Sequence, residues 1–354
     1  MNKGITRAEL REPKPYPIKG VDKLKNAVRE QIVQGMNMDR KTVAAIVGPP
    51  GVGKSVLAID LGMKLVAGKE FWLGRKIKPG AICYFAAEAP GSVTMRAKVA
   101  AERAKCTGDL FFICKAAPGL GGKDTSEEHA NRIIATIRNL NRKIGVDGPI
   151  VMAFIDTVAA TMGDGNENAE GMVLHMQAAR RIAEATGVCV VLIHHPNKND
   201  PFSERGHGSL RGTCEAIIHV NIEEQTGVRI ATLTKARDDQ EGLQLRFELE
   251  RVKIGLDSWG DPQTTVVVKL ATLGKPRQLP KGKNPPVLLR ALERKGDITW
   301  TDAAIRKMAE DELKMQHTSA HKALEVLIAG GYFTAESSPL HRVLKDLPVK
   351  IGAK

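Results

Sequence analysis

Residues Gly48–Ser55 have the composition of a loop that binds phosphate groups, Gly-Pro-Pro-Gly-Val-Gly-Lys-Ser. They match the spacing G-x-x-x-x-G-K-[ST]. The glycines let the backbone curl so that successive N–H groups point at a phosphate, and a following helix adds its dipole. Lys54 would neutralise the β- and γ-phosphates, and Ser55 would offer a hydroxyl to Mg²⁺. The residues expected to contact ATP are Gly48, Pro49, Pro50, Gly51, Val52, Gly53, Lys54, Ser55 and Val56.

A carboxylate that suits the same metal follows a second apolar run. Asp156 comes directly after Ile150–Ile155, so it would emerge at the carboxyl end of a buried strand, beside the phosphate loop. An aspartate at a strand end is also a common helix cap. With the phosphate loop upstream, we expect Asp156 to join Ser55 at Mg²⁺.

The residue after Asp156 is Thr157 and not a glutamate, so a carboxylate that orients the attacking water must come from elsewhere. Glu88 follows the apolar run Ile82–Ala87 and precedes a helical pattern. It would lie at the same edge of the sheet, where a carboxylate can polarise water. The alternative is an acid placed at a helix start by the helix dipole.

The elements that must position these groups follow an alternating pattern from about residue 42. Apolar runs predict strands at Val43–Val47, Ala81–Ala86, Leu110–Cys114, Ile150–Ile155 and Val188–Ile193. Amphipathic stretches predict helices at Val56–Leu65, Val93–Ala104, Glu127–Leu140 and Met172–Ala185. Strands that are apolar throughout and are separated by helices indicate an α/β fold with a mostly parallel sheet.

The pattern changes after His195. Residues Pro196–Ser209 are polar and contain glycine, which predicts a loop. Shorter strand-like runs at Ile217–Ile222, Val228–Thr234, Leu243–Glu250 and Thr265–Leu270 predict an antiparallel extension of the sheet.

A basic, proline-rich segment at Gly274–Pro286 predicts an extended linker. Beyond it, helices are expected at Val287–Arg294, Thr301–Glu312 and Thr318–Ala329, with a hairpin from Tyr332–Thr334 and His341–Leu344. That order is typical of a winged helix. The expected domains are an N-terminal extension at 1–40, an ATPase core at 41–273, the linker at 274–286 and a winged-helix-like domain at 287–354.

Composition narrows the class of protein. Hydrophobic residues make up 42% of the 354-residue chain and charged residues 26%, as in a folded soluble protein. No apolar run approaches the ~20 residues that span a bilayer, and the N-terminus lacks a secretory pattern. The five cysteines are scattered, which favours reduced thiols in the cytoplasm. A formal net charge of +13 favours a polyanionic partner such as DNA.

From Val43 to Glu250 the chain resembles the RecA/DnaB superfamily, and most closely the RepA-type hexameric helicases of plasmids and phages. The resemblance implies that Glu88 activates water, that Asp156 is the Walker B carboxylate, and that a histidine of the pair His194-His195 senses the γ-phosphate. Register with the family selects His195. A zinc site that includes His194, His195 and His207 lacks a fourth ligand at sensible spacing.

The resemblance also implies cations that act in a neighbouring subunit. The segment 234–242, Thr-Lys-Ala-Arg-Asp-Asp-Gln-Glu-Gly, is similar to the motif whose lysine and arginine reach the adjacent ATP site. Either Lys235 or Arg237 would be the finger, with Arg211 as a second candidate. A surface ion pair with Asp238 or Asp239 is the alternative.

Contacts with nucleic acid are expected in the superfamily's channel-lining loops and in the C-terminal domain. The first loop, Gly163–Gly171, carries acids and no cation. The expected DNA-contacting residues are Lys198, Arg205, His207, Arg211 and Lys322. Few aromatic residues (4%) favour backbone electrostatics over base stacking.

Three hypotheses follow for the function. The first is a ring-forming DNA helicase of a bacterium, phage or plasmid, acting on single-stranded DNA, with ATP and Mg²⁺ bound between subunits of a homo-hexamer. The second is a DNA-binding loader or recombination-mediator ATPase that does not unwind DNA, which the acidic first loop favours. The third is a monomeric P-loop kinase or small-molecule enzyme, which the paired cations and the basic tail oppose.

Overall fold

The computed structural model describes residues 29–145, 149–166, 170–197, 200–204, 207–223, 226–271, 282–295, 300–329 and 332–333, together with Ile18 and Gly20. None of the helices within these ranges is long and apolar enough to cross a membrane.

A nine-stranded sheet forms the centre of the protein, in the order β15-β14-β13-β12-β3-β9-β8-β6-β7. Neighbouring strands from β12 to β7 are parallel, and β13, β14 and β15 extend the sheet with antiparallel pairs. The strands are β3 (Val43–Val47), β6 (Ala81–Ala86), β7 (Phe111–Cys114), β8 (Ile150–Asp156), β9 (Cys189–His194), β12 (Ala216–Ile222), β13 (Arg229–Ala236), β14 (Gln244–Leu256) and β15 (Pro262–Leu270). The predicted α/β fold with an antiparallel extension is confirmed.

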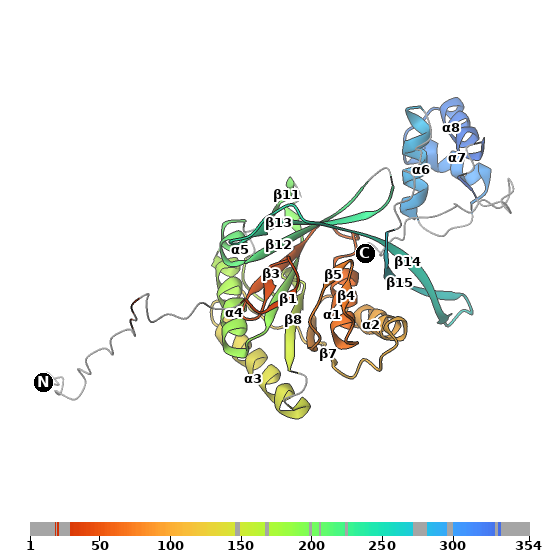
Figure 1. Ribbon diagram of the computed structural model, residues 1–354. Helices are drawn as coiled ribbons and strands as arrows, with labels where there is room; N and C mark the ends of the chain where they lie inside the picture. Colours follow the sequence, from red (N-terminus) through yellow and green to blue (C-terminus); the bar gives the residue numbers. More distant parts are fainter. Residues whose placement is uncertain are drawn as a thin grey trace, which may run out of the picture. The chain divides into compact units, whose positions relative to one another are not determined.

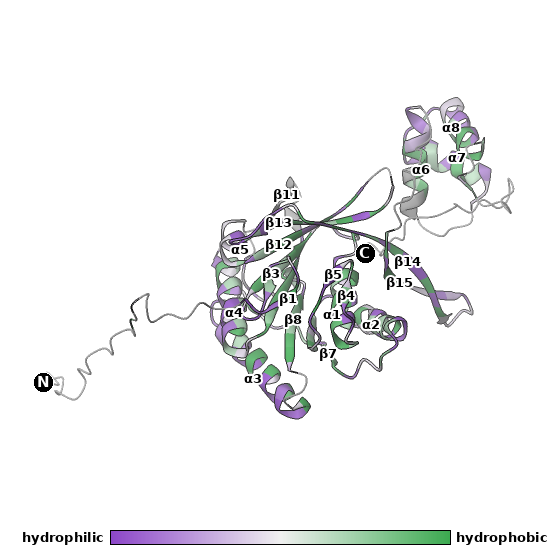
Figure 2. Cartoon of the chain, in the orientation of Figure 1, coloured by the Kyte–Doolittle hydropathy of each residue, from purple (hydrophilic) through white to green (hydrophobic). Residues whose placement is uncertain are grey.

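Helices cover both faces of this sheet (Figure 1). On one face lie α1 (Lys54–Val66) and α2 (Pro90–Ala104), and on the other α3 (Ser126–Ile144), α4 (Glu170–Thr186) and α5 (His207–Thr213). Strand β3 explains why its run is apolar throughout. Ala44 and Ile46 pack in the cluster of α1, whereas Val43, Ala45 and Val47 pack in the cluster of α3 and α4. The central strands are accordingly hydrophobic along their length (Figure 2).

The core reaches further toward the N-terminus than predicted. Strands β1 (Gln31–Val33) and β2 (Met38–Asp39) pair with each other, and Ile32, Val33 and Met38 belong to the apolar cluster of α1. Strands β4 (Phe71–Trp72) and β5 (Arg75–Lys76) form another small pair.

The loop predicted at Pro196–Ser209 is wrong for most of its length. Strand β10 (Pro196–Asn197) pairs with β11 (Asp200–Glu204), and α5 begins at His207. These short polar elements lack the apolar alternation from which a strand or helix is predicted. They satisfy their backbone groups by pairing and not by burying a face.

The C-terminal helices are α6 (Asn284–Lys295), α7 (Asp302–Asp311) and α8 (His317–Ala329), and they share an apolar cluster of their own. Thr301 caps α7, because its Oγ1 accepts a 3.0 Å hydrogen bond from the N–H of Ala304. Helix α6 starts inside the predicted linker, since Pro285 and Pro286 fit the first turn of a helix. The expected hairpin strand at His341–Leu344 lies outside the described residues, so the winged helix stays a prediction.

Candidate nucleotide-binding site

The phosphate loop joins the carboxyl end of β3 to the start of α1, as its sequence predicts. Gly53 caps α1 with φ 102°, a left-handed conformation that favours glycine. At Gly48, a Cβ atom would lie 2.4 Å from the backbone oxygen of Val220. The two glycines are therefore required by backbone conformation at one position and by close packing against β12 at the other.

A cavity of ≈ 550 Å³ opens beside this loop, a volume in the range of small-ligand sites. It brings together the groups that the sequence analysis placed at separate strand ends. Its lining consists of Pro50, Gly51, Gly53, Lys54, Ser55, Glu88, Ala89, Ser92, Val93, Arg96, Asp156, Thr157 and His195.

The ammonium of Lys54 is buried and hydrogen-bonded. Its Nζ donates to the backbone oxygens of Gly48 (2.7 Å) and Pro49 (3.0 Å) and lies 3.1 Å from Nδ1 of His195. Burial lowers the pKa of Lys54 to about 8, against the opposing effects of Asp156 and Glu88. The cation is thus held at the phosphate loop but is poorly solvated, which favours an incoming anion.

Asp156 lies at the end of β8 and is 4% exposed. Its Oδ2 accepts a 2.6 Å hydrogen bond from the hydroxyl of Tyr84. Burial raises the pKa of Asp156, and hydrogen bonds from Tyr84 and Ser55 oppose that shift.

The donors beside Asp156 fit Mg²⁺. The Ser55 hydroxyl is within hydrogen-bonding reach of the Asp156 carboxylate, and both are hard oxygen ligands of the type that Mg²⁺ prefers. Among the described residues, no group of three or more His, Cys, Asp or Glu side chains could hold a metal by itself. This pattern is typical of Mg²⁺, which takes one or two protein ligands together with phosphate oxygens and water.

His195 and Glu88 face each other across the cavity. Nε2 of His195 lies 4.0 Å from Oε2 of Glu88, and the Glu88 side chain is 57% exposed. Its carboxylate therefore has room for a water molecule beside it. His194, the other member of the pair, is 1% exposed at the end of β9 and does not line the cavity. The geometry thus separates the two histidines as the alternation of a strand predicts.

Sequence reasoning missed two side chains of the site. Tyr84 lies in the middle of β6, where its aromatic ring counts as one more apolar residue, and it stacks against Phe154 with ring centroids 5.3 Å apart. Arg96 of α2 lines the cavity, and burial lowers its pKa while Tyr84 and Asp156 oppose the shift. The spacing of Glu88 and Arg96, about two helical turns, is the signal that would have found the arginine.

The three candidate trans cations form one cluster at the ends of β13 and α5. Nζ of Lys235 donates to the backbone oxygen of Arg211, and Nη2 of Arg237 donates to that of Gly212 at 2.8 Å. Arg237 also lies 3.6 Å from Oε1 of Glu215. Burial lowers the pKa of Lys235, and the charges of Arg237 and Arg211 lower it further.

This cation cluster lies toward the opposite edge of the sheet from the phosphate loop of the same chain. Ala236 pairs with Ala216, and Ala216 pairs with Ala44 near the start of β3. The N–H of Arg237 bonds to the oxygen of Glu215, one residue further back. Arg237 is therefore about 13 Å from the end of β3 along the strands, and it is displaced sideways by two strand spacings of about 4.8 Å each.

The expected DNA-contacting residues are only partly described. Lys198 and Arg205 lie outside the described residues, and so does the side chain of His207. Arg211 belongs to the cation cluster, and Lys322 is exposed on α8. The described acids of the first loop include Asp164 and, at the start of α4, Glu170.

Comparison with known proteins gives one family and two similar folds. A family model described as "AAA domain" matches residues 7–201. The ATPase domain of a DnaB-like protein matches 58% of this chain and 81% of its own length, with 13% identity and a TM-score of 0.44. The RadB recombinase matches 59% of this chain and 87% of its own length, with 18% identity and a TM-score of 0.40.

Proposed function

This chain belongs to the AAA domain family and is a RecA-like P-loop ATPase; on that premise we propose that it is a ring-forming, ATP-driven DNA translocase or helicase of the RepA type. It would serve the replication of a plasmid, a phage or another mobile element inside a bacterial cytoplasm. The proposal needs two parts: an ATP site completed by a neighbouring subunit, and DNA as the partner on which the ring acts.

The position of the cation cluster is the observation that carries the first part. Lys235 and Arg237 lie on the far side of the sheet from the Lys54 of their own chain. A cation delivered to the γ-phosphate must therefore come from another copy. Such a cation stabilises the charge that spreads over the phosphoryl oxygens, and it is worth ~10³–10⁵ in rate. Hydrolysis would then depend on assembly.

Within one chain the remaining groups divide the work of phosphoryl transfer. Lys54 and the backbone of the phosphate loop hold the phosphates, and Ser55 with Asp156 holds Mg²⁺, which would supply positive charge to the phosphate oxygens. Glu88 would orient the attacking water. His195, in contact with Lys54, would respond when Lys54 turns toward the nucleotide. Arg96 is a further cation in reach of the same cavity.

DNA is the partner favoured by charge. The net charge of +13 attracts a polyanion, and the binding would weaken as salt increases. Arg211 and Lys322 are the described candidates for phosphate contacts. A second candidate function is a loader that assembles on DNA without unwinding it. It is favoured by Asp164 and Glu170 at the first loop, where a translocating ring would be expected to contact the phosphates.

One experiment tests these parts together. ATPase activity is measured with and without single-stranded DNA over a range of protein concentrations, and the solution mass is measured in parallel. The proposal requires turnover per subunit to rise with protein concentration and with DNA. A strand-displacement assay then separates helicase from loader, because only the helicase opens duplex DNA. Turnover that is independent of both DNA and protein concentration would instead support a monomeric enzyme.

A further inference from the structure

Strands β14 and β15 form a long hairpin whose end stands free of the core. Residues 255–264, here called the hairpin tip, are all exposed. The tip presents two large apolar side chains, Leu256 at 60% exposure and Trp259 at 89%. An almost fully exposed tryptophan on a protein surface is a frequent mark of an interaction site.

The turn that carries Trp259 is well defined. Oδ1 of Asp257 accepts 2.9 Å hydrogen bonds from the N–H groups of Trp259 and Asp261. The N–H of Asp257 in turn donates to the oxygen of Asp261 at 2.8 Å. The indole is thus held on an ordered support, so less conformational entropy is lost when it docks.

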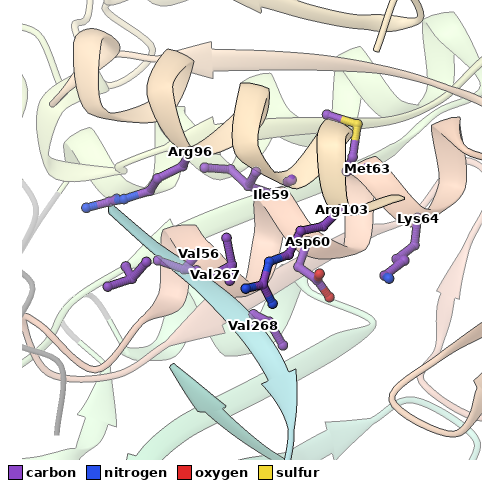
Figure 3. Close-up of a pocket in the computed structure, with 11 residues that line it drawn as sticks. Val56, Ile59, Asp60, Met63, Lys64, Arg96, Arg103, Val267 and Val268 are labelled. Carbon is purple, nitrogen blue, oxygen red and sulfur yellow. The ribbon is translucent and has the colours of Figure 1, made fainter. Parts of the chain in front are cut away.

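The other end of the hairpin is fixed to the helices of the nucleotide site. Arg103 of α2 forms two hydrogen bonds with the Glu250 carboxylate of β14, at 2.9 and 2.5 Å. Val266, Val267 and Val268 of β15 line a small cavity with residues of α1 and α2 (Figure 3). Leu249 packs against the phosphate loop, since a Cβ on Gly53 would lie 3.1 Å from its Cδ1.

The hairpin also extends beyond the sheet edge at which ATP would bind. Gln244 pairs with Thr232, and through His219 this level corresponds to Val47, the last residue of β3. Strand β14 continues from there through Leu256, about 40 Å at 3.3 Å per residue. The tip therefore projects on the same side as the open nucleotide cavity.

We propose that the hairpin tip, through Trp259 and Leu256, docks on a second copy of this chain and forms part of the subunit interface next to the nucleotide site. The inference rests on the proposed assembly, since the cation cluster must come from that neighbour. Charge selects the occupant. The tip carries Asp257 and Asp261 and no lysine or arginine, so DNA phosphates are repelled. A second copy with a net charge of +13 offers a complementary surface.

The first test compares two apolar-to-polar changes on the same hairpin. Trp259→Ser removes the tip contact, whereas Leu270→Ser changes another exposed residue (62%) at the other end of β15. Solution mass is measured over a range of protein concentrations with a non-hydrolysable ATP analogue. We expect Trp259→Ser to need ~10–100-fold more protein to assemble, and Leu270→Ser to behave as wild type. Equal assembly of wild type and Trp259→Ser overturns the docking inference but leaves the proposed function intact. A wild type that stays monomeric with nucleotide and DNA overturns both.

A second test identifies what the tip touches. Trp259 is replaced by the photo-reactive p-benzoylphenylalanine, and the full-length chain is irradiated with nucleotide, with and without DNA. A covalent product of twice the chain mass supports docking on a second copy. A product confined to one chain, for example with residues 282–333, overturns the inference, and so does a product with DNA.

Discussion

Nζ of Lys54 lies 3.1 Å from Nδ1 of His195, so the cation of the phosphate loop contacts the residue that follows β9. The same ammonium donates to the backbone oxygens of Gly48 and Pro49. An arriving γ-phosphate competes for these hydrogen bonds. When Lys54 turns to the phosphate, His195 loses a contact, and the end of β9 thereby registers nucleotide binding.

The first prediction concerns the pH dependence of ATP binding. Burial lowers the pKa of Lys54 to about 8 in the free protein, and bound phosphates raise it again because they favour the ammonium form. Binding therefore takes up a proton above pH 8. The affinity for a non-hydrolysable ATP analogue should be constant from about pH 6.8 to 7.5 and should fall by up to about tenfold per pH unit above pH 8. Titration calorimetry at fixed Mg²⁺ measures it.

The matched comparison for this prediction is Lys54→Arg, whose guanidinium stays charged throughout. Its affinity should be lower than that of wild type at pH 7, because the fork does not fit a site shaped for an ammonium, but it should not change above pH 8. A wild-type affinity that is constant between about pH 7 and 9.5 would show that Lys54 does not titrate in this range.

The second prediction separates hydrolysis from binding at Glu88. Glu88→Gln keeps the size of the side chain but removes the charge that polarises water. ATP affinity should be retained, and turnover should fall by ~10²–10⁴. The control is Glu128→Gln, an exposed acid on α3 whose carboxylate is 3.9 Å from Arg132. Single-turnover hydrolysis measures the effect, and an unchanged rate in Glu88→Gln would remove Glu88 from the mechanism.

The sequence predicts those parts of the site that follow buried strands. The ends of β3, β6 and β8 carry Gly48, Glu88 and Asp156, and their apolar runs are continuous because both faces of each strand are covered. Parallel strands bring their carboxyl ends to one edge, so three positions distant in sequence meet at one cavity. No contact had to be known for this prediction.

Other parts escape sequence reasoning for physical reasons. Tyr84 is half apolar and half polar, and only the position of Asp156 reveals which half acts at the site. Arg96 looks like a solvated helix cation until α2 packs against the cavity. Strand β14 continues beyond Glu250 as an exposed ribbon, so it lacks the apolar face from which its length could be predicted.

The third prediction tests whether the ATP site is shared between subunits. Lys54→Ala should lose nucleotide binding, and Arg237→Ala should lose ~10³–10⁵ in turnover, so each protein alone is inactive. Mixed in equal amounts, they should regain activity. An Arg237→Ala subunit still has an intact phosphate loop, and a Lys54→Ala neighbour can supply its Arg237. In random rings about one quarter of the interfaces are of this kind.

The same mixing experiment ranks the candidate cations. Replacing Arg237→Ala by Lys235→Ala or Arg211→Ala shows which of the three acts across the interface. The control mixes Lys54→Ala with Glu88→Ala. Both residues belong to the subunit that binds ATP, so neither chain then holds a complete site of its own and no activity should return. Absence of recovery in every mixture that pairs Lys54→Ala with a cation variant would contradict a shared site.

The fourth prediction concerns stability at the helix that follows the phosphate loop. Asp60 of α1 accepts a 2.9 Å hydrogen bond from Nε1 of Trp72 and lies at the cavity beneath the hairpin (Figure 3). Burial raises its pKa to about 6, while Lys64 and Trp72 oppose the shift. Since this pKa is above the unfolded value of 3.8, the folded protein holds the proton more tightly. Asp60 therefore costs stability as pH rises from about 4 to about 6, and the cost is complete above that range.

Asp60→Asn should remove that cost because an amide oxygen can still accept from Trp72. We expect a gain of about 1–2 kcal/mol in the free energy of unfolding at pH 8, and little gain at pH 4, where the wild-type carboxyl group is protonated in the folded state. Urea unfolding at both pH values measures it. The control is Asp109→Asn, an exposed aspartate that should change stability little at either pH. A gain of equal size at both pH values would show that side-chain packing, and not the buried charge, is responsible.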